Sequence, residues 1–291
     1  MKGLLLNTLF LFATILCNSQ NKVRGYVIEK KTKTPIPYTT VFNKAQNHGV
    51  YTDSSGYFSL IASQNDTLYF SNIGYESLNL TLKAVNNFDT VYLMPMIHQL
   101  PMIEVSDFFW LKNKSFELGN LNKHGNYVNW VIPGVTIIKY FNNPDPKKKY
   151  IIGSIKIRVS QNTVLYEPRL TRILLYKAED NGEVGSSLID EDEIFTIEKP
   201  NSEFIFFELN KYKITAPVHG FYAGIEIVGF KNEENKNKGA FGIIGNLNTE
   251  FEDGKSFIKY FLPNFRENIL STDHKKINPF ISTVLYEIDK K

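Results

Sequence analysis

Hydrophobic and polar residues alternate along most of this chain, and patterns with the period of a helix are nearly absent. Alternation places every second side chain on one face of a strand, so that one face packs on a core and the other meets water. Short segments between residues 22 and 95 show this pattern, with turn residues at the spacing of a β-sandwich. We predict strands at 23–28, 38–42, 50–52, 57–61, 66–70, 75–80 and 90–93.

A second group of strand-like segments lies in residues 108–291. Some are apolar on both faces, as expected of strands between two sheets, and residues 180–183 carry a hairpin-turn signal. The glycine-rich stretch 239–245 fits a strand with a close backbone approach. Roughly ten strands here fit a jelly-roll-like sandwich. The clearest are predicted at 155–159, 169–176, 204–209, 221–228, 256–261 and 283–286.

The N-terminus has the pattern of an export signal. Lys2 precedes an apolar run that ends near Ile15 and is too short to span a bilayer. Small residues stand three and one positions before a cut after Ser19. We therefore predict a signal peptide at 1–19, a mature chain that begins at Gln20, and no transmembrane segment in that mature chain.

Cys17 is the only cysteine, and it allows a second interpretation of the N-terminus. A lipid attached to Cys17 would tether the protein to a membrane. Lipidation signals need a small residue just before the cysteine, whereas Leu16 is bulky. We therefore favour simple cleavage over a lipid anchor at Cys17.

Size, composition and charge narrow the possible functions. The 291 residues are 43% hydrophobic and 14% aromatic, enough for packed cores. Removing the signal peptide removes one lysine and no acid, so the net charge falls from +3 to +2. This balance gives no support for nucleic-acid binding. We divide the chain into a signal peptide (1–19), a first sandwich (22–95), a linker (96–107) and a second sandwich of unknown function (108–291).

The segment Asp53-Ser54-Ser55-Gly56 carries the clearest local signal. An aspartate at the first position of a four-residue turn accepts hydrogen bonds from N–H groups two and three residues on, and a glycine at the fourth takes a positive φ. A calcium loop would need further acids at alternating positions, where Ser55 and Tyr57 stand instead. We predict that Asp53 and Gly56 form a structural turn.

These turn residues belong to one of four motifs that occur in order over residues 22–95. The motifs are Val23-Arg24-Gly25-Tyr26-Val27, Pro35-Ile36-Pro37-Tyr38-Thr39-Thr40-Val41, Thr52-Asp53-Ser54-Ser55-Gly56-Tyr57-Phe58-Ser59-Leu60 and Ile73-Gly74-Tyr75. Together they resemble the carboxypeptidase-regulatory-like domain, a small transthyretin-like β-sandwich common in secreted and outer-membrane proteins of Bacteroidetes. The resemblance covers about a quarter of the chain.

The resemblance implies a module without catalysis of its own. In metallocarboxypeptidases the module accompanies a separate zinc domain, and no zinc domain is evident in this sequence. It implies no cofactor. Together with the export signal, it implies a protein of the periplasm, the outer membrane surface or the extracellular space.

Candidate catalytic and metal-binding residues are few. No serine lies in a nucleophile elbow, and none of the five histidines belongs to a zinc-binding motif. The acidic run 190–193 could bind calcium, but a solvated loop is favoured because nothing rigid holds its carboxylates together. We therefore predict no catalytic, metal-binding or cofactor-binding residues. The histidines are His48, His98, His124, His219 and His274.

Exposed aromatic side chains could bind sugars, because the apolar faces of sugars pack on aromatic rings. Trp110 and Trp130 are the candidates, together with Phe108, Phe109 and Tyr127. The alternative is that these residues fill the second core or the seam between the domains. We favour this alternative because a chain so rich in Phe and Tyr needs them for its cores.

Two classes of function stay open at this point. The first is a non-catalytic exported protein that binds a glycan or an envelope protein through the second domain. The second is an accessory subunit or enzyme of peptide or polysaccharide processing, with a site in the second domain. The lack of catalytic spacings favours the first class, so we predict a binding protein that is not an enzyme. Exposure of Trp110 or Trp130 would favour a glycan, and burial of both a protein partner.

Overall fold

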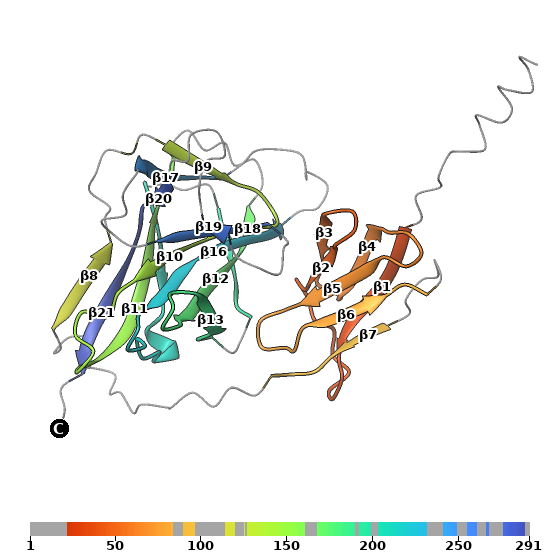
Figure 1. Ribbon diagram of the computed structural model, residues 1–291, viewed down its shortest axis with the longest axis horizontal. Coiled ribbons are helices and arrows are strands. Elements are labelled where there is room, and N and C mark those ends of the chain that lie inside the picture. Colours follow the sequence, from red (N-terminus) through yellow and green to blue (C-terminus); the bar gives the residue numbers. More distant parts are fainter. Residues whose placement is uncertain are drawn as a thin grey trace, which may run out of the picture. The chain divides into compact units, whose positions relative to one another are not determined.

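The computed structural model consists almost wholly of β-strands (Figure 1). It describes residues 22–83, 90–96, 114–119, 125, 127–160, 168–189, 192–198, 203–231, 241–248, 255–260, 266–267 and 276–288. In these ranges the one helical element is a short 3-10 turn, Asn210–Tyr212, and no helix is long and apolar enough to cross a bilayer. The predicted all-β class is confirmed.

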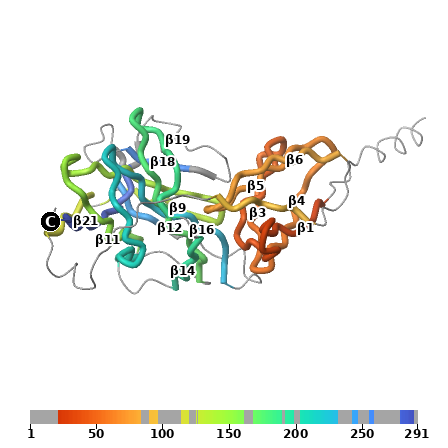
Figure 2. The backbone as a smooth tube through the Cα atoms, turned by 90° about the horizontal axis from the view of Figure 1, so that it is seen from below, coloured from red at the N-terminus to blue at the C-terminus, as the bar shows by residue number. Residues whose placement is uncertain are grey.

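The chain divides into two compact units. The smaller unit comprises Met1–Phe70 and Leu78–Leu93, and the larger unit comprises Ser71–Ser77 and Met94–Lys291. Figure 2 follows the backbone through each unit from red at the N-terminus to blue at the C-terminus. Each unit has its own sheets and its own core.

The smaller unit is a sandwich of two sheets, with strand orders β4-β1-β7 and β3-β2-β5-β6. Strand β1 alternates as its sequence predicts, with Val23 and Val27 buried. The ring of Phe58 on β4 meets the ring of Phe70 on β5 edge to face, with centroids 5.5 Å apart, and so joins the two sheets. The strands are β1 (Lys22–Glu29), β2 (Thr40–Asn43), β3 (His48–Tyr51), β4 (Tyr57–Ile61), β5 (Thr67–Ser71), β6 (Leu78–Thr81) and β7 (Thr90–Leu93).

The turn between β3 and β4 is closed by Asp53 and Gly56. Asp53 Oδ1 accepts hydrogen bonds from the N–H groups of Ser55 (2.8 Å) and Tyr57 (3.0 Å). The N–H of Gly56, which we expected to donate to this carboxylate, donates instead to the main-chain oxygen of Asp53 (3.0 Å), the bond that closes the turn itself. Gly56 has φ +77°, and a Cβ there would lie 2.6 Å from the carbonyl oxygen of Val27. Both facts require glycine.

The larger unit has fourteen described strands, more than the roughly ten expected of a jelly roll. Sheet I has the order β13-β12-β16-β10-β18-β19, with β14 also paired to β12; sheet II has the order β15-β11-β21-β8, and sheet III β20-β17-β9. The strands are β8 (Ser115–Gly119), β9 (Tyr127–Val131), β10 (Val135–Phe141), β11 (Lys149–Arg158), β12 (Arg169–Ala178), β13 (Val184–Ser187), β14 (Ile194–Ile197), β15 (Phe204–Glu208), β16 (Phe221–Phe230), β17 (Phe241–Asn248), β18 (Ser256–Tyr260), β19 (Arg266–Glu267), β20 (Lys276–Pro279) and β21 (Ile281–Ile288).

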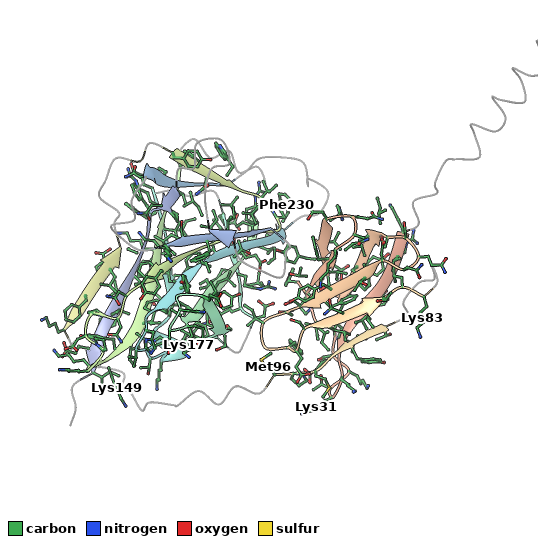
Figure 3. The ribbon with its side chains drawn as sticks, in the orientation of Figure 1. Lys31, Lys83, Met96, Lys149, Lys177 and Phe230 are labelled. Atoms are coloured by element: carbon green, nitrogen blue, oxygen red, sulfur yellow. The ribbon has the colours of Figure 1, made fainter. Side chains whose placement is uncertain are left out.

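The main core of the larger unit lies between sheets I and II. Strands β10, β12 and β16 belong to sheet I, whereas β11 and β15, which come between them in the sequence, belong to sheet II. The chain thus passes back and forth between the two sheets, as in a jelly-roll-like sandwich. Ile137 and Ile225 of sheet I and Ile155 and Ile281 of sheet II are fully buried in this core. Charged residues such as Lys149 extend outward from the sheets (Figure 3). The predicted second sandwich is confirmed.

Strand β10 is one of several strands to which the sequence analysis assigned nothing. It lies in the middle of sheet I, between β16 and β18, and is buried on both faces. Its polar residues Thr136 and Lys139 are therefore fully buried as well. Polar residues inside a doubly buried strand hide both the alternation and the continuous apolar run by which strands are recognised.

Candidate functional site

Trp130 lies on β9, the strand at one edge of sheet III. Its neighbours Asn129 and Val131 point inward and are buried, so Trp130 points outward, and it is 53% exposed. The favoured interpretation of this residue, that its ring fills a core, is therefore wrong. Because Asn129 stands at an inward position, the polar alternation of β9 does not reveal which face is buried.

The indole ring of Trp130 lies beside a position that has no side chain. Trp130 pairs across sheet III with Gly242 of β17. A Cβ at Gly242 would lie 3.3 Å from Cζ3 of Trp130, 2.7 Å from Cγ1 of Val128 and 3.1 Å from Cβ of Ser160. Glycine thus leaves room for the ring to lie close to the sheet. The strand predicted in the glycine-rich stretch 239–245 is confirmed as β17 from Phe241 on. The expected close backbone approach occurs at Gly245, where a Cβ would lie 2.6 Å from the Asn278 oxygen.

The face that carries Trp130 continues onto sheet II. The Ser160 N–H donates to the Gly242 oxygen (2.8 Å), so the chain that follows β11 runs beside β17. Arg158 of β11 forms an ion pair with Glu203 (3.0 Å), with side chains 19% and 41% exposed. The Arg158 guanidinium lies 5.9 Å from the ring centroid of Phe280. The pair places hydrogen-bond donors and acceptors at the end of β11, two residues before Ser160.

A second exposed aromatic ring stands on the same side of sheet II. Ile205 and Phe207 of β15 pack on the core, so Phe206 between them points outward, and it is 55% exposed. Phe206 pairs with Lys156 of β11, whose Nζ lies 4.4 Å from the ring centroid of Phe204. Phe206 gives no signal in the sequence, because the run Phe-Ile-Phe-Phe does not indicate which ring faces outward.

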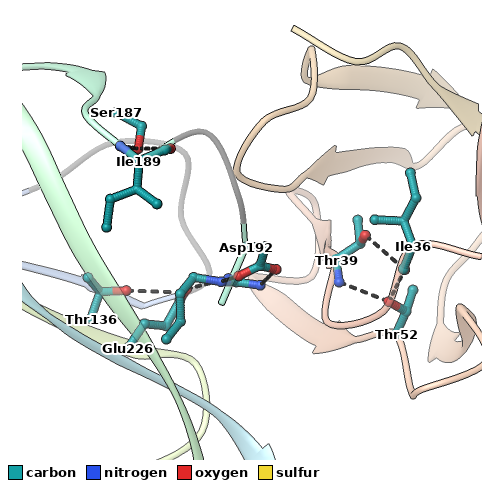
Figure 4. A network of polar contacts seen from close by, with 9 residues as sticks. Ile36, Thr39, Thr52, Thr136, Ser187, Ile189, Asp192 and Glu226 are labelled. Carbon is teal, nitrogen blue, oxygen red and sulfur yellow. Dashed lines mark hydrogen bonds and ion pairs between the residues drawn. The ribbon is translucent and has the colours of Figure 1, made fainter. Parts of the chain in front are cut away.

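The face of sheet I turned away from the main core carries a buried ion-pair cluster (Figure 4). Arg172 of β12 bonds to Glu226 of β16 (2.6 Å) and to both carboxylate oxygens of Asp192 (2.5 and 2.7 Å). The Thr136 hydroxyl of β10 donates to Glu226 (3.1 Å). Arg172 and Glu226 are each 3% exposed. The cluster ties three neighbouring strands together, which is a structural role.

This cluster corrects the prediction for the acidic run 190–193. Asp192 is 15% exposed and bonded to Arg172, and Glu193 pairs with Lys211 (2.5 Å). The expected solvated loop is therefore wrong at Asp192, whereas Glu193 and Lys211 form a solvent-exposed pair, with side chains 34% and 58% exposed. Asp190 and Glu191 lie outside the described residues. Asp192 and Glu193 each pair with a cation distant in the sequence, which periodicity does not reveal.

The described histidines lie in ordinary surface positions. His48 opens β3 and is exposed, and His219 Nε2 lies 3.2 Å from Asp180 Oδ1 with both side chains largely exposed. In the described part of the chain, no group of three His, Cys, Asp or Glu side chains could hold a metal ion. Outside the described residues lie the signal peptide, Cys17, Trp110, Phe108, Phe109, His98, His124 and His274.

Two tyrosines share the face of sheet I that carries the cluster. The rings of Tyr140 and Tyr222 have centroids 5.4 Å apart. Burial raises the pKa of Tyr222 to about 12 and raises the pKa of Tyr140 above its usual 10.0. The Tyr222 hydroxyl donates to the Gly182 oxygen (2.5 Å) and that of Tyr140 to the His219 oxygen (2.9 Å). Both hydroxyls therefore act as neutral donors that hold loops.

Comparison with known proteins identifies a domain in the N-terminal part of the chain. Residues 23–104 match the model of the CarboxypepD_reg-like domain, so the predicted resemblance is confirmed and the chain contains such a domain. The two-sheet architecture of the smaller unit agrees with the transthyretin-like sandwich of that domain. No curated protein matches the chain.

Two solved structures are similar over much of the chain, those of the Gt and Gx strains of infectious bursal disease virus. Their TM-scores are 0.23 and 0.24, with 8% and 9% sequence identity. The match covers 86% of this chain in both cases, and 54% and 56% of the viral chains. This chain thus spans little more than half the length of those chains.

Proposed function

We propose that this protein is exported and binds a glycan through the larger unit, with Trp130 in contact with a sugar ring, and that it catalyses no reaction. The observation that carries the proposal is the Trp130 indole, 53% exposed and held beside Gly242. A protein that exposes a large ring loses the stabilisation that its burial would give, of about 1.5–3 kcal/mol for large apolar side chains. A ring kept outside the core is therefore available for recognition.

Two further features support a glycan over an envelope protein. The face that carries Trp130 continues to the Arg158–Glu203 ion pair. The polar groups of this pair can bond to sugar hydroxyls. The ring itself offers the flat apolar surface on which a sugar face packs. The CarboxypepD_reg-like domain then acts as a spacer or docking unit, and the recognition surface lies on the rigid sandwich of the larger unit.

A glycan array with the mature chain from Gln20 tests this proposal. Trp130→Ala should weaken binding to every positive glycan by about 1–2 kcal/mol, because aromatic packing is lost. Tyr92→Ala is the matched control: Tyr92 is also an exposed aromatic, at 44%, but lies on β7 of the smaller unit. It should leave glycan binding unchanged.

Two results would contradict the proposal. One is full glycan binding by the Trp130→Ala variant. The other is hydrolysis of glycans or peptides by the purified protein, abolished by a single His or acid substitution in the larger unit. Export is tested separately by the intact mass of the protein from its native host: cleavage after Ser19 is expected, and a lipid-modified species that begins at Cys17 would contradict it.

A further inference from the structure

Two exposed aromatic rings of the larger unit lie on one continuous face, and the following inference rests on the proposed glycan-binding function. Trp130 is 53% exposed and Phe206 is 55% exposed. Trp130 belongs to sheet III and Phe206 to sheet II. Of these two rings, the proposed function assigns a role to Trp130 alone.

The end of β11 joins the two sheets into that continuous face. The oxygen of Gly242, the partner of Trp130, accepts a hydrogen bond from the Ser160 N–H. The N–H of the preceding residue, Val159, donates to the Glu203 oxygen just before β15. Lys156, four residues before Ser160, pairs with Phe206. Ile155, Ile157 and Val159 point into the main core. Lys156 and Ser160 alternate with them and therefore point outward. The rings of Phe206 and Trp130, which follow the register of Lys156 and Ser160, point to the same side.

The separation of the rings follows from this register. The path from Trp130 to Phe206 crosses from β9 to β17, from β17 to the end of β11, and from β11 to β15. These three strand spacings amount to about 14 Å across the strands. Along β11, Ser160 lies beside Gly242 and Lys156 pairs with Phe206. The two rings are therefore also offset by four residues along the strand direction, about 13 Å. One sugar ring is comparable in size to one aromatic ring, so a single sugar cannot contact both. A chain of several sugars can.

The groups between the rings favour a glycan over a protein partner. Arg158 and Glu203 form an ion pair there, and Lys156 lies over the ring of Phe204. Glutamate and lysine, the types of Glu203 and Lys156, are depleted at protein–protein interfaces. Ionic groups that alternate with aromatic rings match the alternation of hydroxyls and apolar faces along a glycan.

We propose that one linear glycan chain binds across this face, in contact with Trp130 at one end and Phe206 at the other. The ligand class is thus a polysaccharide recognised along its length, and not a terminal sugar. Arg158, Glu203 and Lys156 bond to hydroxyls of the sugars between the two rings.

The test is the dependence of affinity on oligosaccharide length, measured by calorimetry with the mature full-length chain. The probes are linear cello-, chito- and laminari-oligosaccharides, each from the disaccharide to the octasaccharide. In the series that binds, affinity should rise with length. Phe206→Ala should weaken octasaccharide binding about three- to tenfold and leave disaccharide binding unchanged, whereas Trp130→Ala should weaken both.

Two control variants separate a lost contact from a damaged fold. Phe206→Tyr keeps the ring and should keep octasaccharide affinity. Val218→Ala changes a side chain that is also 55% exposed and should have no effect. If Phe206→Ala binds the octasaccharide as the wild type does, or if affinity does not depend on length, the inference is overturned while the proposed function stands. If no oligosaccharide of the three series binds, the proposed function fails and the inference fails with it.

Discussion

Two faces of the larger unit, both turned away from the main core, differ in the exposure of their charged and aromatic residues. On sheet I the outward face buries the Arg172–Glu226 pair, each residue 3% exposed. On sheets II and III the outward face exposes the rings of Trp130 and Phe206. Side chains that water solvates well are thus buried on one face, and side chains that water solvates poorly are exposed on the other.

This difference separates stability from recognition. Buried charges are stable only as a complete hydrogen-bonded set, so the loss of one charged member of the Arg172 cluster should strongly destabilise the folded state. Exposed rings contribute little to folding, so Trp130 and Phe206 can be replaced at small cost to the sandwich. The comparison predicts that substitutions on the first face change unfolding and substitutions on the second change binding.

The largest expected effect is that of Arg172→Met. The substitution leaves the Glu226 carboxylate buried without its cation, and breaking a buried pair in this way costs about 3–5 kcal/mol. Urea unfolding of the full chain, followed by tryptophan fluorescence, measures it, because both tryptophans lie in residues 94–291, in the larger unit. Lys177→Met, which removes an exposed pair with Glu179, should cost less than about 1 kcal/mol. Equal losses in the two variants would contradict the comparison.

A smaller effect is expected from Tyr222→Phe, on the same face as the cluster. The folded protein keeps the Tyr222 proton up to pH about 12, whereas the unfolded chain loses it near 10.0. Between these pH values the unfolded state binds fewer protons, so the free energy of unfolding falls as the pH rises, by on the order of 2 kcal/mol. Below pH 10 this contribution is fully present.

The matched measurement is the difference in stability between wild type and Tyr222→Phe at several pH values. The variant lacks the hydrogen bond to the Gly182 oxygen, so it should be less stable by about 1 kcal/mol at pH 8. The gap should close or reverse by pH 12, because the variant has no Tyr222 proton to lose. Other titrating groups are common to both proteins and cancel. A gap that stays constant would show that the Tyr222 pKa is not raised.

The sequence predicted the regular part of this molecule well. Strands that alternate or are apolar, such as β1 and β16, lie where they were expected, and the motifs around Asp53 identified a family whose model matches. The misses have one physical cause. Thr136, Asp192 and Glu226 are paired across strands or loops far apart in the sequence, and periodicity reports burial of apolar residues alone.

The proposed binding surface was only half predictable for a related reason. Trp130 was named because tryptophan is a suitable residue for sugar contact, but composition favoured burial, and the structure shows the opposite. Phe206 gave no signal, since its neighbours on β15 are also aromatic or aliphatic. Which face of a strand is exposed depends on the sheet that packs against it, and that packing partner is distant in the sequence.

The smallest effect on stability, and a selective one on binding, is expected from Gly242→Ala. The new Cβ would lie 2.7 Å from Val128 Cγ1 and 3.3 Å from Trp130 Cζ3, so the indole must move away from the sheet. Val128 is partly exposed and can yield, whereas Ser160, whose Cβ would lie 3.1 Å away, is buried. We therefore expect a loss of about 1 kcal/mol in unfolding, the low end of the cost of overpacking. Glycan binding should weaken several-fold, because the ring that packs on the sugar is displaced by a few tenths of an ångström or more.

Gly182→Ala is the control. Gly182 has φ +78° and no atom near its missing Cβ, so alanine should cost about 1 kcal/mol through backbone strain and leave binding intact. If both variants bind glycan equally well, the position of Trp130 over Gly242 does not matter, and the distinction between a face for stability and a face for recognition fails at this residue.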